Sequence, residues 1–235
     1  MAYQFHFEIV SANAGLLLTG LGYTILLSVM TLVIASVIGV IVAVARSRRI
    51  PLISRMLGFY VEFFRGTPPL VQLVWMYYCL PILTGINIPD LVAVLLALSL
   101  YTGAFMAEVF RAGIQGVDKG QVQAALSVGM TRSQAMRRIV LPQAAYRMIP
   151  NVGNVFITTI KASALCSVLG FPELMYQAQT IQAVYFRPLE TLTAVALLYF
   201  ALTWTTSQLL GFIERRLAWV KRPLPASPPR LGGLS

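Results

Sequence analysis

The segment LLLTGLGYTILLSVMTLVIASVIGVIVAVA, residues 16–45, contains no charged side chain. A helix of this length spans about 45 Å, which exceeds the ~30 Å hydrocarbon core of a bilayer. The apolar run is also much longer than the roughly 7–15-residue core of a signal peptide, so we expect it to be retained as a membrane span. The segment therefore predicts that the chain folds within a membrane.

The rest of the chain repeats this pattern. Of its 235 residues, 57% are hydrophobic and only 11% are charged, whereas soluble domains carry about 25% charged residues. Uncharged runs, and one run whose single charge is Lys161, predict helices over residues 16–45, 56–80, 88–112, 148–171 and 190–213. The predicted fold class is all-α, a polytopic membrane protein with five transmembrane helices.

The basic residues predict how these spans are oriented. Of the 18 Lys and Arg residues, fifteen fall in one set of connecting segments, Arg187 alone falls in the other, and Arg65 and Lys161 fall inside spans. By the positive-inside rule, residues 1–15 face the periplasm and the tail, residues 216–235, faces the cytoplasm. The net charge of +10 thus reflects topology and contact with the lipid bilayer, not nucleic acid. The composition of the tail predicts disorder.

The connecting segment of residues 115–142 contains helix signals of its own. Residues 121–128 are good helix formers, and Gly129 follows where a left-handed C-terminal residue is expected. The sequence Thr131–Gln134 fits a capping box, which predicts a second short helix that ends at Pro142. Two short helices with an apolar edge form a shape that fits a groove on another protein.

This loop resembles the EAA motif of ABC importer permeases, in which the motif forms the coupling helices that dock into the ATPase. The matching residues are Gln121, Gln123, Ala124, Ala125, Gly129, Leu141 and Pro142. The stretches EFFRGTPPLVQ, residues 62–72, and GAFMAE, residues 103–108, resemble signatures of the polar amino acid branch. The family usually has Glu where this chain has Gln123, which removes a charge but keeps a hydrogen-bond acceptor.

The resemblance implies a type I ABC importer permease in the bacterial inner membrane. Its partners would be a second permease subunit, identical or homologous, two ATPase subunits that bind ATP and Mg²⁺, and a periplasmic substrate-binding protein. This chain would bind no cofactor and perform no enzymatic reaction, and it contains no GxxxxGK[ST] loop. An ion-coupled carrier that works without an ATPase is the alternative, although it would have no use for the capped loop.

Polar and broken positions inside the predicted spans indicate the transport path. Ionisable residues there are functional candidates because lipid solvates them poorly. Pro68 and Pro69 lack an N–H and free the carbonyls of Phe64 and Arg65, and transporters place substrate sites at such breaks. A simple kink and hydrogen bonds between helices are the alternatives. The candidate path residues are Arg65, Gly66, Thr67, Pro68, Leu70, Asn151, Asn154, Thr158, Lys161 and Ser163.

Two i,i+3 charge pairs are candidates for a gating or purely structural role. Glu62 and Arg65 are spaced to neutralise each other within the second span, and Glu108 and Arg111 lie near the cytoplasmic end of the third. For the substrate, many polar amino acid permeases carry Asp directly after the lysine that corresponds to Lys161, and some cationic ones carry an acid seven residues before that Asp. Here these positions are Ala162 and Val155. The resemblance therefore predicts an acidic or neutral polar substrate, unless the sister subunit supplies the binding site.

Overall fold

The computed structural model describes residues 3–47 and 50–218, and every regular element in these ranges is helical. In chain order they are α1 (Glu8–Ala12), α2 (Ala14–Ser47), α3 (Pro51–Gly66), α4 (Pro69–Val74), the π-helical turn η1 (Trp75–Cys79), α5 (Leu80–Thr84), α6 (Asp90–Gln115), α7 (Lys119–Ser127), α8 (Arg132–Ala135), the π-helical turn η2 (Met136–Val140), α9 (Leu141–Ser163), the 3₁₀ turn η3 (Ala164–Leu169), α10 (Leu174–Tyr185) and α11 (Pro188–Ala218). Within the described residues, four helices are long and apolar enough to cross a membrane: Ala14–Arg46, Asp90–Gln115, Arg132–Leu169 and Pro188–Arg216. The all-α membrane class is confirmed.

The remaining predicted span, residues 56–80, is not one continuous helix. It is divided into α3 and the α4–α5 segment, and Thr67 between them is extended, with φ −107° and ψ 147°. The break predicted at the two prolines is therefore confirmed. Its cause is local, because the residue before a proline is disfavoured in the helical region.

The predicted helix end at Pro142 is wrong. The chain stays helical from Arg132 to Leu169, so the second loop helix and the fourth span form one element. The π-helical turn η2 ends at Val140, directly before α9, and Pro142 occupies the first turn of α9. A π-helical turn shifts the hydrogen-bond pattern by one residue and accommodates a proline that would break a regular helix.

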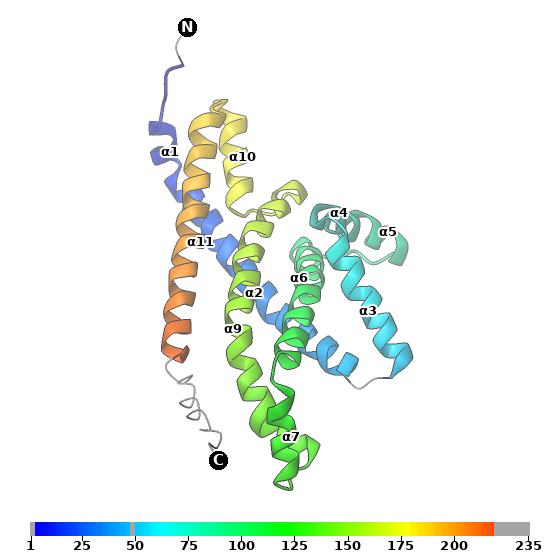
Figure 1. The fold of residues 1–235 in the computed structure, drawn as a ribbon. Helices are drawn as coiled ribbons and strands as arrows, with labels where there is room; N and C mark the ends of the chain where they lie inside the picture. The colour runs from blue at the N-terminus through cyan, green and yellow to red at the C-terminus, as the bar shows by residue number, and fades with distance from the viewer. Residues whose placement is uncertain (1–2, 48–49, 219–235) are drawn as a thin grey trace.

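The core forms where α2 packs against α6. In Figure 1, α2 runs obliquely across the bundle behind α9 and α6. Gly39 makes this crossing close, since a Cβ there would lie 2.7 Å from Met106 Cβ. A buried cluster joins α2, α4, α6 and η3 through Leu27, Leu73, Val94, Ala97, Leu98, Cys166 and Leu169, with Phe171 beyond them. Small residues at helix crossings are the usual means of close packing in membranes.

The two ends of the bundle carry different elements. The helices α1 and α10 lie at one end, while α7 and the C-terminal end of α11 lie at the other (Figure 1). The helix α10 was not predicted, because it is short and only weakly periodic between two long spans. The tail predicted to be disordered begins at residue 216, but α11 extends to Ala218, so residues 216–218 are helical. From residue 219 onward the predicted disorder lies outside the described residues.

Candidate functional site

The helix break is capped by its own side chains. The backbone N–H and the hydroxyl of Thr67 both donate to the carbonyl of Phe63, at 3.1 and 2.8 Å. The carbonyl of Phe64, which Pro68 leaves without a helical donor, accepts from Gln72 Nε2 at 3.0 Å. The carbonyl freed by the proline is therefore paired within the protein, by a glutamine one turn beyond the break.

The predicted ion pair between Glu62 and Arg65 is not formed. Both side chains are exposed, and the described residues hold no ion pair for either. The guanidinium of Arg65 instead lies over the ring of Phe105 on α6, with Cζ 5.4 Å from the ring centroid. Cations are attracted to the faces of aromatic rings, and this contact links Arg65 on α3 to α6. Gly66, Pro68 and Leu70 are exposed beside it.

The polar stripe on α9 lies on one exposed face. Asn151, Asn154, Thr158 and Lys161 are all exposed, as their three- and four-residue spacing predicts. Ser163 does not share this face: it is fully buried, and its hydroxyl donates to the carbonyl of Ile160 at 2.8 Å. The structure thus separates Ser163 from the other candidate path residues on this helix.

A hollow of about 160 Å³ lies between α6 and α9 beside this stripe. Its walls include Phe105, Asn154, Val155 and Thr158, and none of its lining residues carries a carboxylate. Because Arg65 lies over the Phe105 ring, residues from α3, α6 and α9 converge here. Of the candidate path residues, Asn154 and Thr158 line the hollow and Arg65 contacts its Phe105 wall.

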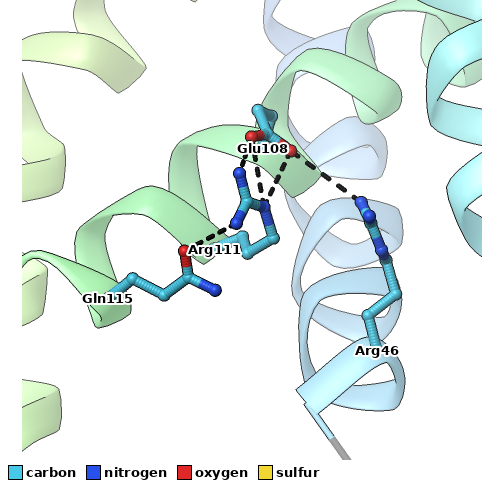
Figure 2. A network of polar contacts seen from close by, with 4 residues as sticks. All are labelled: Arg46, Glu108, Arg111 and Gln115. Atoms are coloured by element: carbon cyan, nitrogen blue, oxygen red, sulfur yellow. Dashed lines mark hydrogen bonds and ion pairs between the residues drawn. The ribbon is translucent and has the colours of Figure 1, made fainter. Parts of the chain in front are cut away.

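A charged network links the C-terminal part of α2 to the C-terminal part of α6 (Figure 2). The guanidinium of Arg111 binds both carboxylate oxygens of Glu108, with Nε 3.1 and 3.0 Å from them. Arg46 Nη1 lies 3.8 Å from Glu108 Oε2, and Arg111 Nη1 donates to Gln115 Oε1 at 2.6 Å. The second predicted pair is therefore formed, and α2 extends it. Gln115 is the last residue of α6 before the loop, so the network connects the spans to the loop.

The loop begins with α7, which ends as the sequence predicts. Gly129 has φ +86°, in the left-handed region. The N–H of Met130 donates to Ala125 O at 3.1 Å and that of Gly129 to Leu126 O at 3.0 Å. These two bonds define a Schellman motif, which fixes the direction of the chain after the helix.

The capping box after Gly129 is also confirmed. Thr131 N donates to Gln134 Oε1 at 2.8 Å, and Gln134 N donates to Thr131 Oγ1 at 3.2 Å. Among the motif residues Ala125 is buried, whereas Gln121, Gln123, Ala124, Gly129, Leu141 and Pro142 are exposed. The motif is thus held in shape by one buried alanine and two caps, while most of its side chains stay available to a partner.

Sequence reasoning missed Glu173, which lies fully buried where α10 begins. Its carboxylate accepts from the N–H groups of Met175 and Tyr176 at 2.9 and 2.8 Å, and from the Tyr199 hydroxyl at 2.6 Å. Burial raises the pKa of Glu173 above its usual range. A lone carboxylate after Pro172, immediately before a helix-forming stretch, was the available signal.

Comparison with known proteins identifies the family of this chain. The model of the family described as "binding-protein-dependent transport system inner membrane component" matches residues 35–219. The chain belongs to this family. Its members are transport components and not enzymes, which confirms the resemblance to permeases of amino acid ABC transporters.

Individual members of the family match over most of their length. The chain is 39% identical over 204 residues to the probable amino-acid permease protein YxeN of Bacillus subtilis (strain 168), covering 86% of this chain and 91% of YxeN. It is 34% identical to the glutamine transport system permease protein GlnP of Escherichia coli (strain K12), covering 91% of this chain and 98% of GlnP. A solved amino acid ABC transporter with histidines matches with a TM-score of 0.87 and 39% identity, over 91% of this chain and all of that one. The type I importer fold is therefore shown.

Proposed function

We propose that this chain is the membrane-spanning subunit of an ATP-driven importer that moves a polar amino acid across the bacterial inner membrane. A second permease subunit would pair with it, two ATPase subunits would dock on the loop, and a periplasmic binding protein would deliver the substrate. Relatives named for glutamine, cystine and arginine transport support an amino acid substrate. ATP and Mg²⁺ would be bound by the ATPase alone.

The observation that carries the coupling proposal is the preformed loop between α6 and α9. Two caps define its shape, its motif residues are exposed, and it lies at the end of the bundle opposite to α1 (Figure 1). The charged network at Glu108 ends at Gln115, directly before this loop. Movement of a docked ATPase would therefore be transmitted to α6 and α2 through the hydrogen bonds and ion pairs of this network. Co-purification tests this: an ATPase subunit is expected with the wild-type chain, and an ion-coupled carrier would bring down none.

We infer that the substrate is acidic or neutral rather than cationic. The hollow between α6 and α9 contains no carboxylate, Val155 lines it, and Arg65 lies against its Phe105 wall. Lys161 is exposed on the same face of α9 as Asn154. A cationic side chain would meet positive charge here and gain no ion pair, so its desolvation would be uncompensated.

Competition in reconstituted vesicles tests the substrate class. Glutamate, glutamine, arginine and lysine are each added against the labelled native substrate, and we expect glutamate or glutamine to compete best. Val155→Glu should shift the preference toward arginine and lysine, while Val152→Glu on the same helix, outside the hollow, should not. Preferred uptake of arginine by the wild type, persisting after acids are removed from the sister subunit, would contradict the inference.

The proposed orientation, with the N-terminus in the periplasm and the C-terminus in the cytoplasm, rests on the distribution of basic residues. Labelling of single cysteines tests it. Single cysteines at Asn13 or Thr84 should react with an impermeant thiol reagent on intact cells. Those at Gln115 or Ser227 should react only after permeabilisation. Labelling of the Ser227 position from outside would show an even number of spans.

A further inference from the structure

The buried amide of Gln72 occupies the position of the hydrogen bond that Pro68 cannot make. In a continuous helix, the residue at position 68 would donate its N–H to the carbonyl of Phe64. Here Gln72 Nε2 lies 3.0 Å from Phe64 O and 3.1 Å from Thr67 O. Because both groups are acceptors, only the amide nitrogen can face them, and the orientation of the side chain is fixed.

The two sides of the break are held by different parts of the bundle. On α3, the hydroxyl of Tyr60 donates to Leu100 O at 2.7 Å, and Val61 is buried against Val42 of α2. On α4, Leu73 is 1% exposed within the core cluster formed with η3. Backbone at Thr67 joins the two sides in an extended conformation. Gln72, only 6% exposed on α4, reaches back across the break to α3.

We propose that Gln72 is a positioning residue that sets the angle between α3 and α4, and through it the place of Arg65 in the transport path. Arg65 directly follows Phe64, so the last turn of α3 carries both the bonded carbonyl and the guanidinium that lies over Phe105. Loss of the amide leaves a carbonyl unpaired and loosens this turn. The role in transport rests on the proposed function, whereas the structural coupling to Pro68 does not.

A double-mutant cycle between Gln72 and Pro68 tests the structural step. Gln72→Met keeps the volume and removes the donors, so the melting temperature of the purified chain should fall. In a Pro68→Ala background, the new alanine supplies an N–H that can donate to Phe64 O, so the same change should lower the melting temperature by less than half as much. Gln208→Met on the exposed face of α11 is the matched control, and its effect should be equal in both backgrounds. An equal effect of Gln72→Met in the two backgrounds would overturn the assignment.

Transport measurements separate positioning from a purely structural role. In vesicles holding the ATPase and the binding protein, Gln72→Met should lower substrate-stimulated turnover per folded complex about fivefold, the factor that one buried hydrogen bond supplies. The substrate concentration for half-maximal rate should change less than the rate, because Gln72 does not line the hollow beside Asn154. Unchanged turnover per folded complex would reduce Gln72 to a structural residue and sink the proposal. Absence of stimulated turnover in the wild type would instead count against the proposed function. The double-mutant cycle between Gln72 and Pro68 would not be affected, because it measures stability and not transport.

Discussion

Replacing Glu173 with alanine removes one carboxylate that joins three helices. In the wild type it caps α10 through the N–H groups of Met175 and Tyr176, accepts from the hydroxyl of Tyr199 on α11, and lies 3.4 Å from the hydroxyl of Thr24 on α2. The variant leaves these donors buried without an acceptor. We therefore expect α10 to detach from α2 and α11 before the rest of the bundle unfolds.

The magnitude follows from the donors that lose their partner. Loss of a helix cap costs about 1 kcal/mol, and leaving the buried hydroxyl of Tyr199 unpaired costs about 1–3 kcal/mol. The Thr24 hydroxyl is not counted, because its 3.4 Å contact is long for a hydrogen bond between oxygens. Together these amount to roughly 2–4 kcal/mol, which corresponds to a fall in melting temperature of roughly 4–16 °C for a chain of this size. Glu173→Gln keeps one acceptor oxygen and should fall between the wild type and the alanine variant.

The buried thiol of Cys166 provides the assay. Cys166 is fully buried in the core, while Cys79 is partly exposed. In a Cys79→Ser background, a thiol-reactive dye therefore reports unfolding at one site. Tyr199→Phe removes one of the donors that Glu173→Ala would leave unpaired, so the double variant should lose less stability than the sum of the single ones. A melting temperature of Glu173→Ala equal to that of the wild type, or strict additivity, would refute the reasoning.

Three further substitutions and one pH series extend these tests. Gly129→Asp should abolish stimulated transport while the protein still inserts into the membrane. Gly85→Asp is the control, because Gly85 also has a positive φ, +68°, and lies far from the loop. Both substitutions carry a backbone penalty of about 1 kcal/mol, but Gly85→Asp should keep transport. Gly39→Ala should lower the melting temperature because its Cβ would lie 2.7 Å from Met106 Cβ, whereas Gly22→Ala, with no neighbour within 4 Å, should not. Phe186→Gly should raise the melting temperature, since this exposed residue has φ +52°; a fall would show that the ring packs on something. Burial raises the pKa of Glu173. Its contribution to stability is therefore full at pH values below the ordinary pKa of glutamate and is lost as the pH rises through the raised pKa. The difference in melting temperature between the wild type and Glu173→Ala should be largest in acid.

Features fixed by neighbouring residues were predictable from the sequence. The uncharged run of residues 16–45, the left-handed Gly129 and the capping box at Thr131 each depend on a short window, and the structure contains all three. The end predicted at Pro142 was also a local inference, and it failed. A π-helical turn before Pro142 lets the helix continue through the proline. The sequence alone does not distinguish such a turn from a helix end.

Features that depend on distant partners were not predictable. Arg65 contacts the ring of Phe105 on α6 and forms no ion pair with Glu62 on its own helix. Glu173 is satisfied by a tyrosine 26 residues later and a threonine 149 residues earlier. Spacing rules describe one helix at a time, and these pairs exist only once helices have packed.

The contrast between Glu173 and the stripe on α9 supports the proposed second permease subunit. Glu173 is a polar residue that is fully buried, and its carboxyl group accepts hydrogen bonds from donors within this chain. Asn151, Asn154 and Lys161 are equally polar, yet they lie exposed on a helix apolar and long enough to cross the membrane. Lipid cannot hydrogen-bond these groups, so a polar face at that depth requires protein or water beside it. A second subunit facing this stripe would enclose it together with Arg65, and the enclosed space would be polar on the side where a polar amino acid must pass.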